Sequence, residues 1–127
     1  MRMKHYAFDS SFIINFLSGD ERAAEFYHGL KAKRLAVPAP VKLETLRGVK
    51  SLEVFEKLEK PGFKDEEASE ALKLLEFLEE EGEMIGIMDL MIASIAATNS
   101  LTVISYDQDF SKLEGYDGFE YELVQSG

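Results

Sequence analysis

The sequence predicts an α/β fold, with a small central parallel sheet that is covered by helices on both faces. Short runs of aromatic, apolar and β-branched residues alternate along the chain with longer segments whose apolar residues recur every three or four positions. The length of 127 residues corresponds to a single domain, residues 1–127, which is long enough to bury a core. The sequence also contains no internal repeat or low-complexity tract.

The first strand is expected at residues 4–8, where a short run with aromatic residues stops at a polar segment. A helix over residues 12–17 follows at once and ends at Ser18-Gly19, because glycine readily adopts the backbone conformation that closes a helix. Asp20 is a suitable first residue for a second helix, because its side chain accepts hydrogen bonds from the free N–H groups of the first turn.

The middle of the chain is expected to hold a second strand and further helical turns. Residues 35–37 form a short apolar run, and Pro40 behind them suits the first turn of a helix, where its missing N–H would have no partner. From Val41 to about Glu59 the pattern predicts one bent helix or two short ones, with a break at Gly48. Pro61-Gly62 then marks a turn.

A long amphipathic helix is expected from Asp65, with three acidic residues in its first turn, where the helix dipole favours negative charge. Its apolar residues recur at helical spacing: Ala68, Ala71, Leu72, Leu75 and Leu78.

The last third of the chain is expected to contain the most buried elements. Residues 87–98 are apolar on every side, which predicts a buried helix, and the β-branched run 101–105 predicts a buried strand. Residues 106–113 are expected to form a loop with a short helix, and 119–124 the last edge strand.

The composition excludes several classes of site. The chain has no cysteine, so it has no disulfide, cysteine-bound zinc, iron–sulfur cluster or thiol nucleophile, and a reducing cytoplasm is the expected location. The N-terminus does not resemble a signal peptide, and the longest weakly charged run is too short to span a bilayer, so no membrane association is expected.

The net charge of −10 is distributed unevenly. Residues 31–64 carry nine basic and four acidic side chains, whereas residues 65–127 carry two basic and sixteen acidic ones. The basic middle offers contacts to a phosphate backbone. Its candidates, each of which has the alternative of lying on a solvated helix face, are Lys31, Lys33, Arg34, Lys42, Arg47 and Lys50.

Four carboxylates are expected at one edge of the sheet. Asp9 and Asp107 follow strands, and Asp89 is the charged residue at the start of the apolar helix. Glu44 lies in the first turns of the helix after the second strand. Ligands of open parallel sheets bind beyond the carboxyl ends of the strands, and carboxylates gathered there repel one another unless a hard divalent cation such as Mg²⁺ or Mn²⁺ binds.

Each carboxylate also has an ordinary structural explanation. Asp9, Asp89 and Asp107 have the residue type that caps helices, and Glu44 taken alone fits a solvated helix position. His5 and His28 are interpreted as ordinary strand and helix residues.

Four segments of the sequence contain these acids: Asp9-Ser10-Ser11-Phe12-Ile13-Ile14, Leu43-Glu44-Thr45-Leu46-Arg47-Gly48, Ile87-Met88-Asp89-Leu90-Met91-Ile92-Ala93 and Ser105-Tyr106-Asp107-Gln108-Asp109-Phe110. In this order they resemble the motifs of PIN-domain ribonucleases, and the length and match suggest the VapC toxins of prokaryotic toxin–antitoxin pairs. The resemblance implies a Mg²⁺- or Mn²⁺-dependent endoribonuclease of PIN-like fold that cuts RNA by a metal-activated water. Such proteins are often homodimers and are silenced by a cognate antitoxin.

The resemblance also assigns roles to individual residues. It makes Asp9, Glu44, Asp89 and Asp107 the catalytic, metal-binding acids, with Asp109 as a further candidate ligand. Ser105 matches a supporting position that holds a water or phosphate. From the basic middle of the chain, and not from the resemblance, Lys42 and Arg47 are the candidates for contacts with the RNA backbone. An apolar surface for a second copy or an antitoxin is sought among Met3, Phe12, Phe16, Phe26 and Tyr27.

Two other functions fit parts of the sequence. A binding module that kept the fold without catalysis would leave the same pattern of elements. A phosphoacceptor receiver domain is also α/β and lined with acids, but it requires paired acids after the first strand, where Asp9 stands alone. The acidic helix at residues 65–83 is interpreted as a solvated face, with repulsion of non-target RNA or contact with a basic partner segment as the alternatives.

Overall fold

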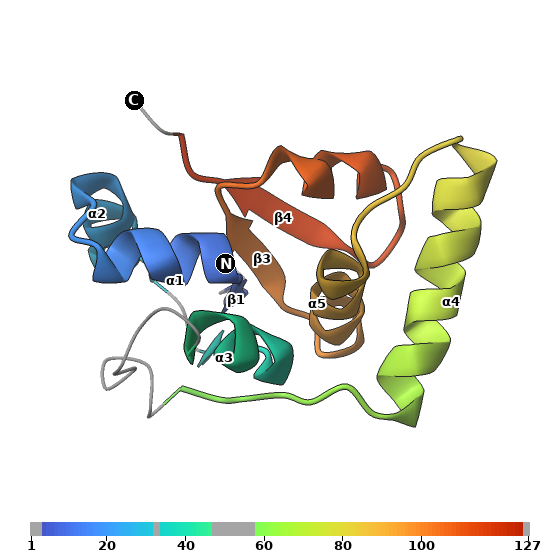
Figure 1. Ribbon diagram of the computed structural model, residues 1–127, viewed down its shortest axis with the longest axis horizontal. Helices are drawn as coiled ribbons and strands as arrows, with labels where there is room; N and C mark the ends of the chain where they lie inside the picture. Colours follow the sequence, from blue (N-terminus) through green and yellow to red (C-terminus); the bar gives the residue numbers. More distant parts are fainter. Residues whose placement is uncertain (1–3, 32–33, 47–57, 126–127) are drawn as a thin grey trace.

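The computed structural model describes residues 4–31, 34–46 and 58–125. In these residues four strands form one parallel sheet in the order β2-β1-β3-β4 (Figure 1). The strands are β1 His5–Phe8, β2 Arg34–Ala36, β3 Thr102–Ser105 and β4 Glu120–Leu123. Because all the strands run in the same direction, the residues that follow β1 and β3 emerge at the same edge of the sheet.

Helices flank the sheet, which confirms the predicted α/β architecture. In Figure 1, α1 and α2 lie on one side of the strands, and α4 and α5 on the other. The helical segments are α1 Ser10–Leu17, α2 Glu21–Gly29, α3 Ala39–Leu46, α4 Asp65–Glu80, α5 Ile87–Thr98 and the short 3-10 helix η2 Gln108–Leu113. None of the described helices has the length and apolar character needed to cross a membrane.

An aromatic cluster joins β1 to the first two helices. The ring of Phe12 stacks on Phe8 with 4.7 Å between centroids, and both side chains are fully buried. Phe16, Phe26 and Tyr27 pack against the same core. The expectation that these residues leave an apolar surface is therefore wrong for Phe12, which lies in the core because the start of α1 faces the sheet. Met3 lies outside the described residues.

The predicted helix to about Glu59 is wrong at its end. Glu59 forms a parallel bridge with Ala36, in which the N–H of Val37 donates to the Glu59 carbonyl at 2.8 Å. Backbone groups that pair with the edge of β2 cannot also belong to a helix. The predicted break at Gly48 lies outside the described residues.

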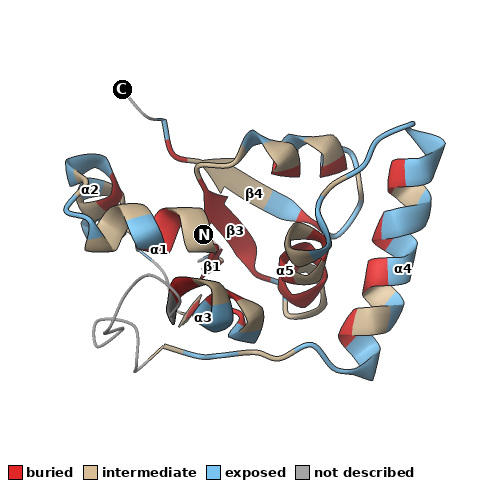
Figure 2. Ribbon diagram, in the orientation of Figure 1, coloured by how far each residue is buried: buried red, intermediate tan, exposed pale blue. Residues whose placement is uncertain are grey.

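The buried face of α4 differs from the predicted one (Figure 2). Ala71, Leu74 and Leu78 are buried, whereas Leu72 is 63% and Leu75 is 38% exposed. Glu67 also lies on the buried side, because its carboxylate accepts the Lys64 backbone N–H at 2.9 Å and so closes the first turn. Contact with α5 determines which face of α4 is buried. Leucines lie on two sides of α4, so the apolar pattern alone does not identify the buried face.

The elements at the centre of the fold agree with their predicted burial. All residues of β3 are buried, and β4 is an edge strand. In α5 the stretch from Ile92 to Ala96 is buried, but Ile87 is 73% exposed, so the prediction of burial on every side is wrong for the first turn. That turn leaves the core at the point where Asp89 stands.

We predict that Leu74→Ala lowers the free energy of unfolding by about 2–5 kcal/mol, because the substitution leaves a cavity against α5. Leu72→Ala removes the same atoms from an exposed position of the same helix and should change it by no more than about 0.5 kcal/mol. Urea unfolding followed by circular dichroism measures both values. Equal losses in the two variants would contradict the described face of α4.

Candidate metal centre

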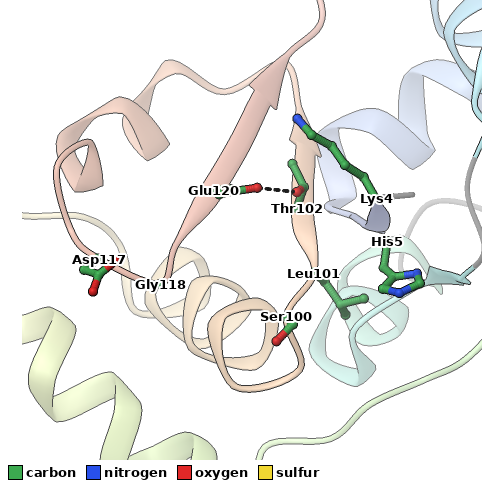
Figure 3. A pocket seen from close by; sticks show the side chains of 8 residues that line it. All are labelled: Lys4, His5, Ser100, Leu101, Thr102, Asp117, Gly118 and Glu120. Atoms are coloured by element: carbon green, nitrogen blue, oxygen red, sulfur yellow. Dashed lines mark hydrogen bonds between the residues drawn. The ribbon is translucent and has the colours of Figure 1, made fainter. Parts of the chain in front are cut away.

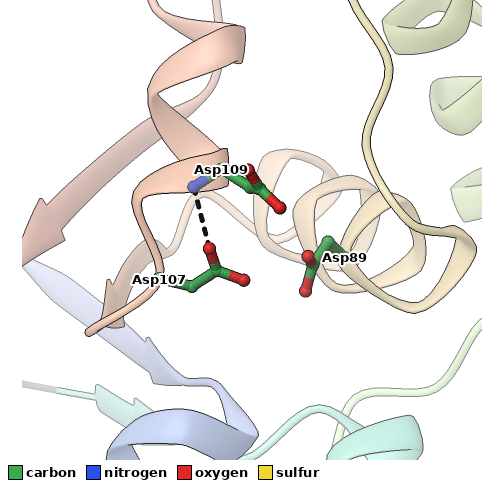
Figure 4. Close-up of side chains that lie close together, drawn as sticks. All are labelled: Asp89, Asp107 and Asp109. Atoms are coloured by element: carbon green, nitrogen blue, oxygen red, sulfur yellow. Dashed lines mark hydrogen bonds between the residues drawn. The ribbon is translucent and has the colours of Figure 1, made fainter.

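Three carboxylates from two segments meet beyond the carboxyl end of β3. Asp89, Asp107 and Asp109 each offer an oxygen, and these oxygens all lie within 4.8 Å of one another. Figure 4 shows the side chain of Asp89 on α5 pointing toward the other two, which stand at the start of η2. We call these three residues the aspartate cluster. All three are partly buried.

Local hydrogen bonding explains the placement of the two aspartates at η2. The chain leaves the sheet after β3, and Asp107 caps the following 3-10 helix by accepting the Asp109 N–H at 2.9 Å (Figure 4). This hydrogen bond fixes one oxygen of Asp107. Asp109 lies two residues further along the chain, in the first turn of η2. The capping interpretation of Asp107 is thus correct, and it is compatible with a place in the cluster.

Asp9 lies behind the cluster and is almost completely buried, with 2% of its surface exposed. Its Oδ1 accepts hydrogen bonds from the Phe12 N–H at 3.0 Å and from the Ser11 hydroxyl at 2.7 Å. Its Oδ2 accepts one from the Ser105 hydroxyl. The carboxylate therefore caps α1 and is held by three donors, which is how a buried charge is made tolerable.

The two serine hydroxyls connect Asp9 to the turn that carries Asp107. Ser11 Oγ accepts the Tyr106 N–H at 3.0 Å, and Ser105 Oγ accepts the Asp107 N–H at 2.8 Å. Ser105 is fully buried, so its hydroxyl does not face the solvent from which a water or phosphate would bind. Its contacts are those of a residue that positions Asp9 and Asp107.

The two serines after Asp9 had no role predicted from the sequence. Ser11 bonds Asp9, and Ser10 donates to Glu44 Oε1 at 2.9 Å. The sequence does show two residues with hydroxyl groups directly after an acid at the end of a strand, and this pattern could have indicated their role. Which acid each serine bonds depends on how α1 and α3 pack, and the sequence does not contain that geometry.

The structure brings together only part of the predicted set of acids. Among the described residues, the group close enough to share an ion contains Asp89 and Asp107 together with Asp109. Asp9 and Glu44 lie outside that group, and each is connected to its surroundings through a serine. The expectation that Asp9, Glu44, Asp89 and Asp107 form one ligand set therefore stays a prediction, and Asp109, the further candidate ligand, lies with Asp89 and Asp107.

The predicted RNA-contacting residues are only partly described. Lys42 is exposed on α3, two residues before Glu44. Arg47 lies outside the described residues, as do Lys33 and Lys50. Arg34 forms a two-point ion pair with Glu59, with both nitrogen–oxygen distances 2.7 Å.

Burial and mutual repulsion disfavour ionisation in this region. Burial, followed by the negative charges of Asp107 and Asp9, raises the pKa of Asp89 to about 7. Burial also raises the pKa of Asp9, although its hydrogen bonds from Ser105, Phe12 and Ser11 act in the opposite direction. A divalent cation with a preference for oxygen ligands would remove this repulsion, so the donor set fits Mg²⁺ or Mn²⁺.

A separate cavity of about 370 Å³ lies at the other end of the sheet (Figure 3). Residues at the starts of the strands line it, among them Lys4, His5 and Glu120. Asp9 and the aspartate cluster follow the opposite ends of β1 and β3, so this cavity is not part of the cluster. His5 therefore lies at the end of the sheet opposite to the aspartate cluster.

Comparisons with known proteins agree with the geometry. The protein-family model of the PIN domain matches residues 6–116. A search of curated protein sequences returned no significant match. Among solved structures, VapBC-5 from Mycobacterium tuberculosis, a member of the VapBC family of toxin–antitoxin systems, is 27% identical, with a TM-score of 0.75 over 94% of this chain and 98% of that one.

Two further structures show the same fold at lower identity. VapBC2 from Rickettsia felis, bound to a DNA fragment from the promoter, is 21% identical, with a TM-score of 0.80 over 94% of this chain and 98% of that one. DNA-bound VapBC from Salmonella typhimurium is 20% identical, with a TM-score of 0.75 over 97% of this chain and 100% of that one.

We predict that Ser105→Ala lowers the free energy of unfolding by about 1–3 kcal/mol, because it leaves a buried oxygen of Asp9 without its donor. Ser111→Ala serves as the control: its hydroxyl donates to the Gln108 carbonyl at an exposed site, so its loss should cost no more than about 0.5 kcal/mol. Urea unfolding at pH 7 in EDTA compares the two. Equal stability of the two variants would argue against the buried role of Ser105.

The raised pKa of Asp89 predicts that the metal-free protein becomes less stable as the pH rises. The folded state holds a proton up to about pH 7, whereas the unfolded chain releases it near the ordinary value of 3.8. Asp89 therefore makes its full contribution to stability below about pH 4 and loses it as the pH rises through 7. Thermal unfolding in EDTA between pH 5 and 8 should show a larger decline for the wild type than for Asp89→Asn. Parallel profiles would contradict the assigned pKa.

Proposed function

The chain belongs to the PIN domain family, and on that premise we propose that it is a single-domain, Mg²⁺- or Mn²⁺-dependent endoribonuclease that acts as the toxin of a toxin–antitoxin pair. The observation that carries the proposal is the aspartate cluster, with the buried Asp9 behind it, at the carboxyl end of a parallel sheet. The likeness to VapBC-5, a toxin–antitoxin system, supports the assignment of an antitoxin partner.

Asp89, Asp107 and Asp109 would hold the ion, because they offer oxygens close enough to share it. When bound, the ion supplies a Lewis acid that lowers the pKa of a water nucleophile and neutralises charge on the phosphodiester. Asp9 and Glu44 remain in the proposal as acids of the same site, attached to it through Ser105 and Ser10.

The chain's own residues prepare this site in two ways. The hydrogen bonds from Ser11 and Ser105 fix Asp9 and, through their contacts with the Tyr106 and Asp107 N–H groups, the turn that carries the cluster. Fixing the ligands before the ion binds reduces the ordering that binding itself requires. Partial burial of the three carboxylates limits competition from water for the same oxygens.

Recognition of RNA is assigned to basic residues beside the acids. Lys42 on α3 is exposed and close in sequence to Glu44, and we include Arg47 from the same segment. The chain as a whole carries a charge of −10, so binding of RNA would depend on such local contacts and on the bound cation. We further propose that the protein works in the cytoplasm as a homodimer.

The family match favours this function over the receiver-domain interpretation, because the match covers the segments that hold all four motifs. A catalytically silent binding module of the same fold remains the alternative. The two differ in a single observable, which is whether the folded protein cuts RNA when Mn²⁺ is supplied.

We predict that the wild type cleaves single-stranded RNA with Mn²⁺ and not with EDTA, and that Asp89→Asn and Asp107→Asn each reduce the rate by roughly 100-fold or more, since each removes several kcal/mol of charge stabilisation. Gel analysis of a labelled RNA pool gives the rates. Asp117→Asn makes the same chemical change beside the distant cavity and should cleave like the wild type.

Circular dichroism of each variant is the control for folding. If the folded wild type cuts no RNA with Mn²⁺ or Mg²⁺ but still binds a partner protein tightly, the binding-module interpretation replaces the nuclease. If Asp117→Asn is as inactive as Asp89→Asn, the cluster is not the site.

A further inference from the structure

A lysine stands beside the aspartate cluster. Lys112, in the last turn of η2, places Nζ 3.4 Å from Asp109 Oδ1 and donates a hydrogen bond to the Met84 carbonyl at 3.0 Å. Residues 65–127 contain sixteen acidic side chains and only one other basic residue, Lys73. The scarcity of positive charge in this part of the chain makes a lysine at the cluster a feature that needs an explanation.

We propose that Lys112 is a built-in counter-ion of the aspartate cluster, which competes with the divalent cation for Asp109 and so lowers the metal affinity of the site. The inference rests on the proposed function, because it assigns a role toward the metal site. Lys112 acts through Asp109 and is a tuning residue, not a catalytic one.

The ammonium of Lys112 changes the net charge around the aspartate cluster. The three carboxylate oxygens lie within 4.8 Å of one another, and Lys112 is paired with one of those three residues. A positive charge at this distance partly neutralises the repulsion among the acids. The same charge repels an incoming divalent cation, which must share Asp109 with it.

Lys112 is not needed to position Asp109. The side chains of Lys112 and Asp109 are 34% and 48% exposed, and ion pairs with such exposure contribute little to stability. Asp109 is placed by its own position in η2 and by its N–H bond to Asp107. Removing Lys112 therefore leaves the ligand in place and changes mainly the charge around it.

Other carboxylates line a hollow beside Lys112. Lys112 also lines a hollow of about 410 Å³ between the end of α4 and η2. Glu81, Glu83 and Glu114 line the same hollow. A shift of the ammonium toward these carboxylates would leave it beside negative charge when a divalent cation binds Asp109.

Direct titration of the metal-free protein with Mn²⁺ tests the inference, with free Mn²⁺ measured by electron paramagnetic resonance. We expect Lys112→Gln to bind Mn²⁺ about five-fold more tightly than the wild type at low salt, and the difference to shrink in high salt, because the effect is electrostatic. Lys112→Arg keeps the charge and should bind like the wild type. Circular dichroism verifies the fold of each variant.

Lys4→Gln is the matched control. Lys4 Nζ also lies 3.4 Å from a carboxylate, that of Glu122, but at the starting end of β1, next to the cavity in Figure 3. The substitution removes the same charge and an ion pair of the same length, so unchanged Mn²⁺ affinity is expected. A gain equal to that of Lys112→Gln would assign the effect to net charge and overturn the inference.

The remaining outcomes separate the inference from the proposed function. If the wild type binds Mn²⁺, Asp107→Asn abolishes binding, and Lys112→Gln binds equally well or more weakly, the metal site stands and the counter-ion role is overturned. If Lys112→Arg binds as tightly as Lys112→Gln, charge is not the cause, and the counter-ion role is again overturned. If the wild type binds no Mn²⁺, the proposed function and the inference fail together.

Discussion

The rest of the site depends on the hydrogen bonds to the buried carboxylate of Asp9. Asp9 ends β1, caps α1 through the Phe12 N–H, and accepts hydroxyl donors from α1 and from the end of β3. A charge that is 2% exposed is tolerated only when its oxygens are bonded, so the segments that supply these donors must close around it. The turn after β3 is thereby fixed, and η2 begins where its two aspartates face Asp89.

A second constraint follows from the first, because the same folding that satisfies Asp9 gathers more negative charge than the region tolerates. Burial and the neighbouring negative charges raise the pKa of Asp89 to about 7. The described residues offer two ways to relieve this repulsion, a proton on Asp89 or the ammonium of Lys112 beside Asp109, and the donor chemistry offers a divalent cation as a third. The further inference is that Lys112 and a divalent cation compete for Asp109 in this cluster.

The predictable parts of the fold were those with a strong local signal. The β-branched run of β3, the caps at Asp9 and Asp20, and the acidic first turn of α4 each specify an element by themselves. The errors arose where a distant contact decides between equal local choices. Leu72 and Leu74 are equally apolar, and packing on α5 buries the second and exposes the first. Glu59 fits a helix locally, but it pairs with Ala36 at the edge of the sheet.

The same division applies to the candidate site. The residue types and their order along the chain were sufficient to predict a parallel α/β fold with acids at its carboxyl edge, because the alternation of strands and helices and the preference of aspartate for helix caps can be read from short stretches of sequence. Membership of the aspartate cluster required the folded chain. The distance between carboxylate oxygens depends on how α5 approaches η2, and so Asp109 joins Asp89 and Asp107 while Asp9 and Glu44 bond to serines. Distances between segments remote in sequence are set by packing, and no pattern within one segment encodes them.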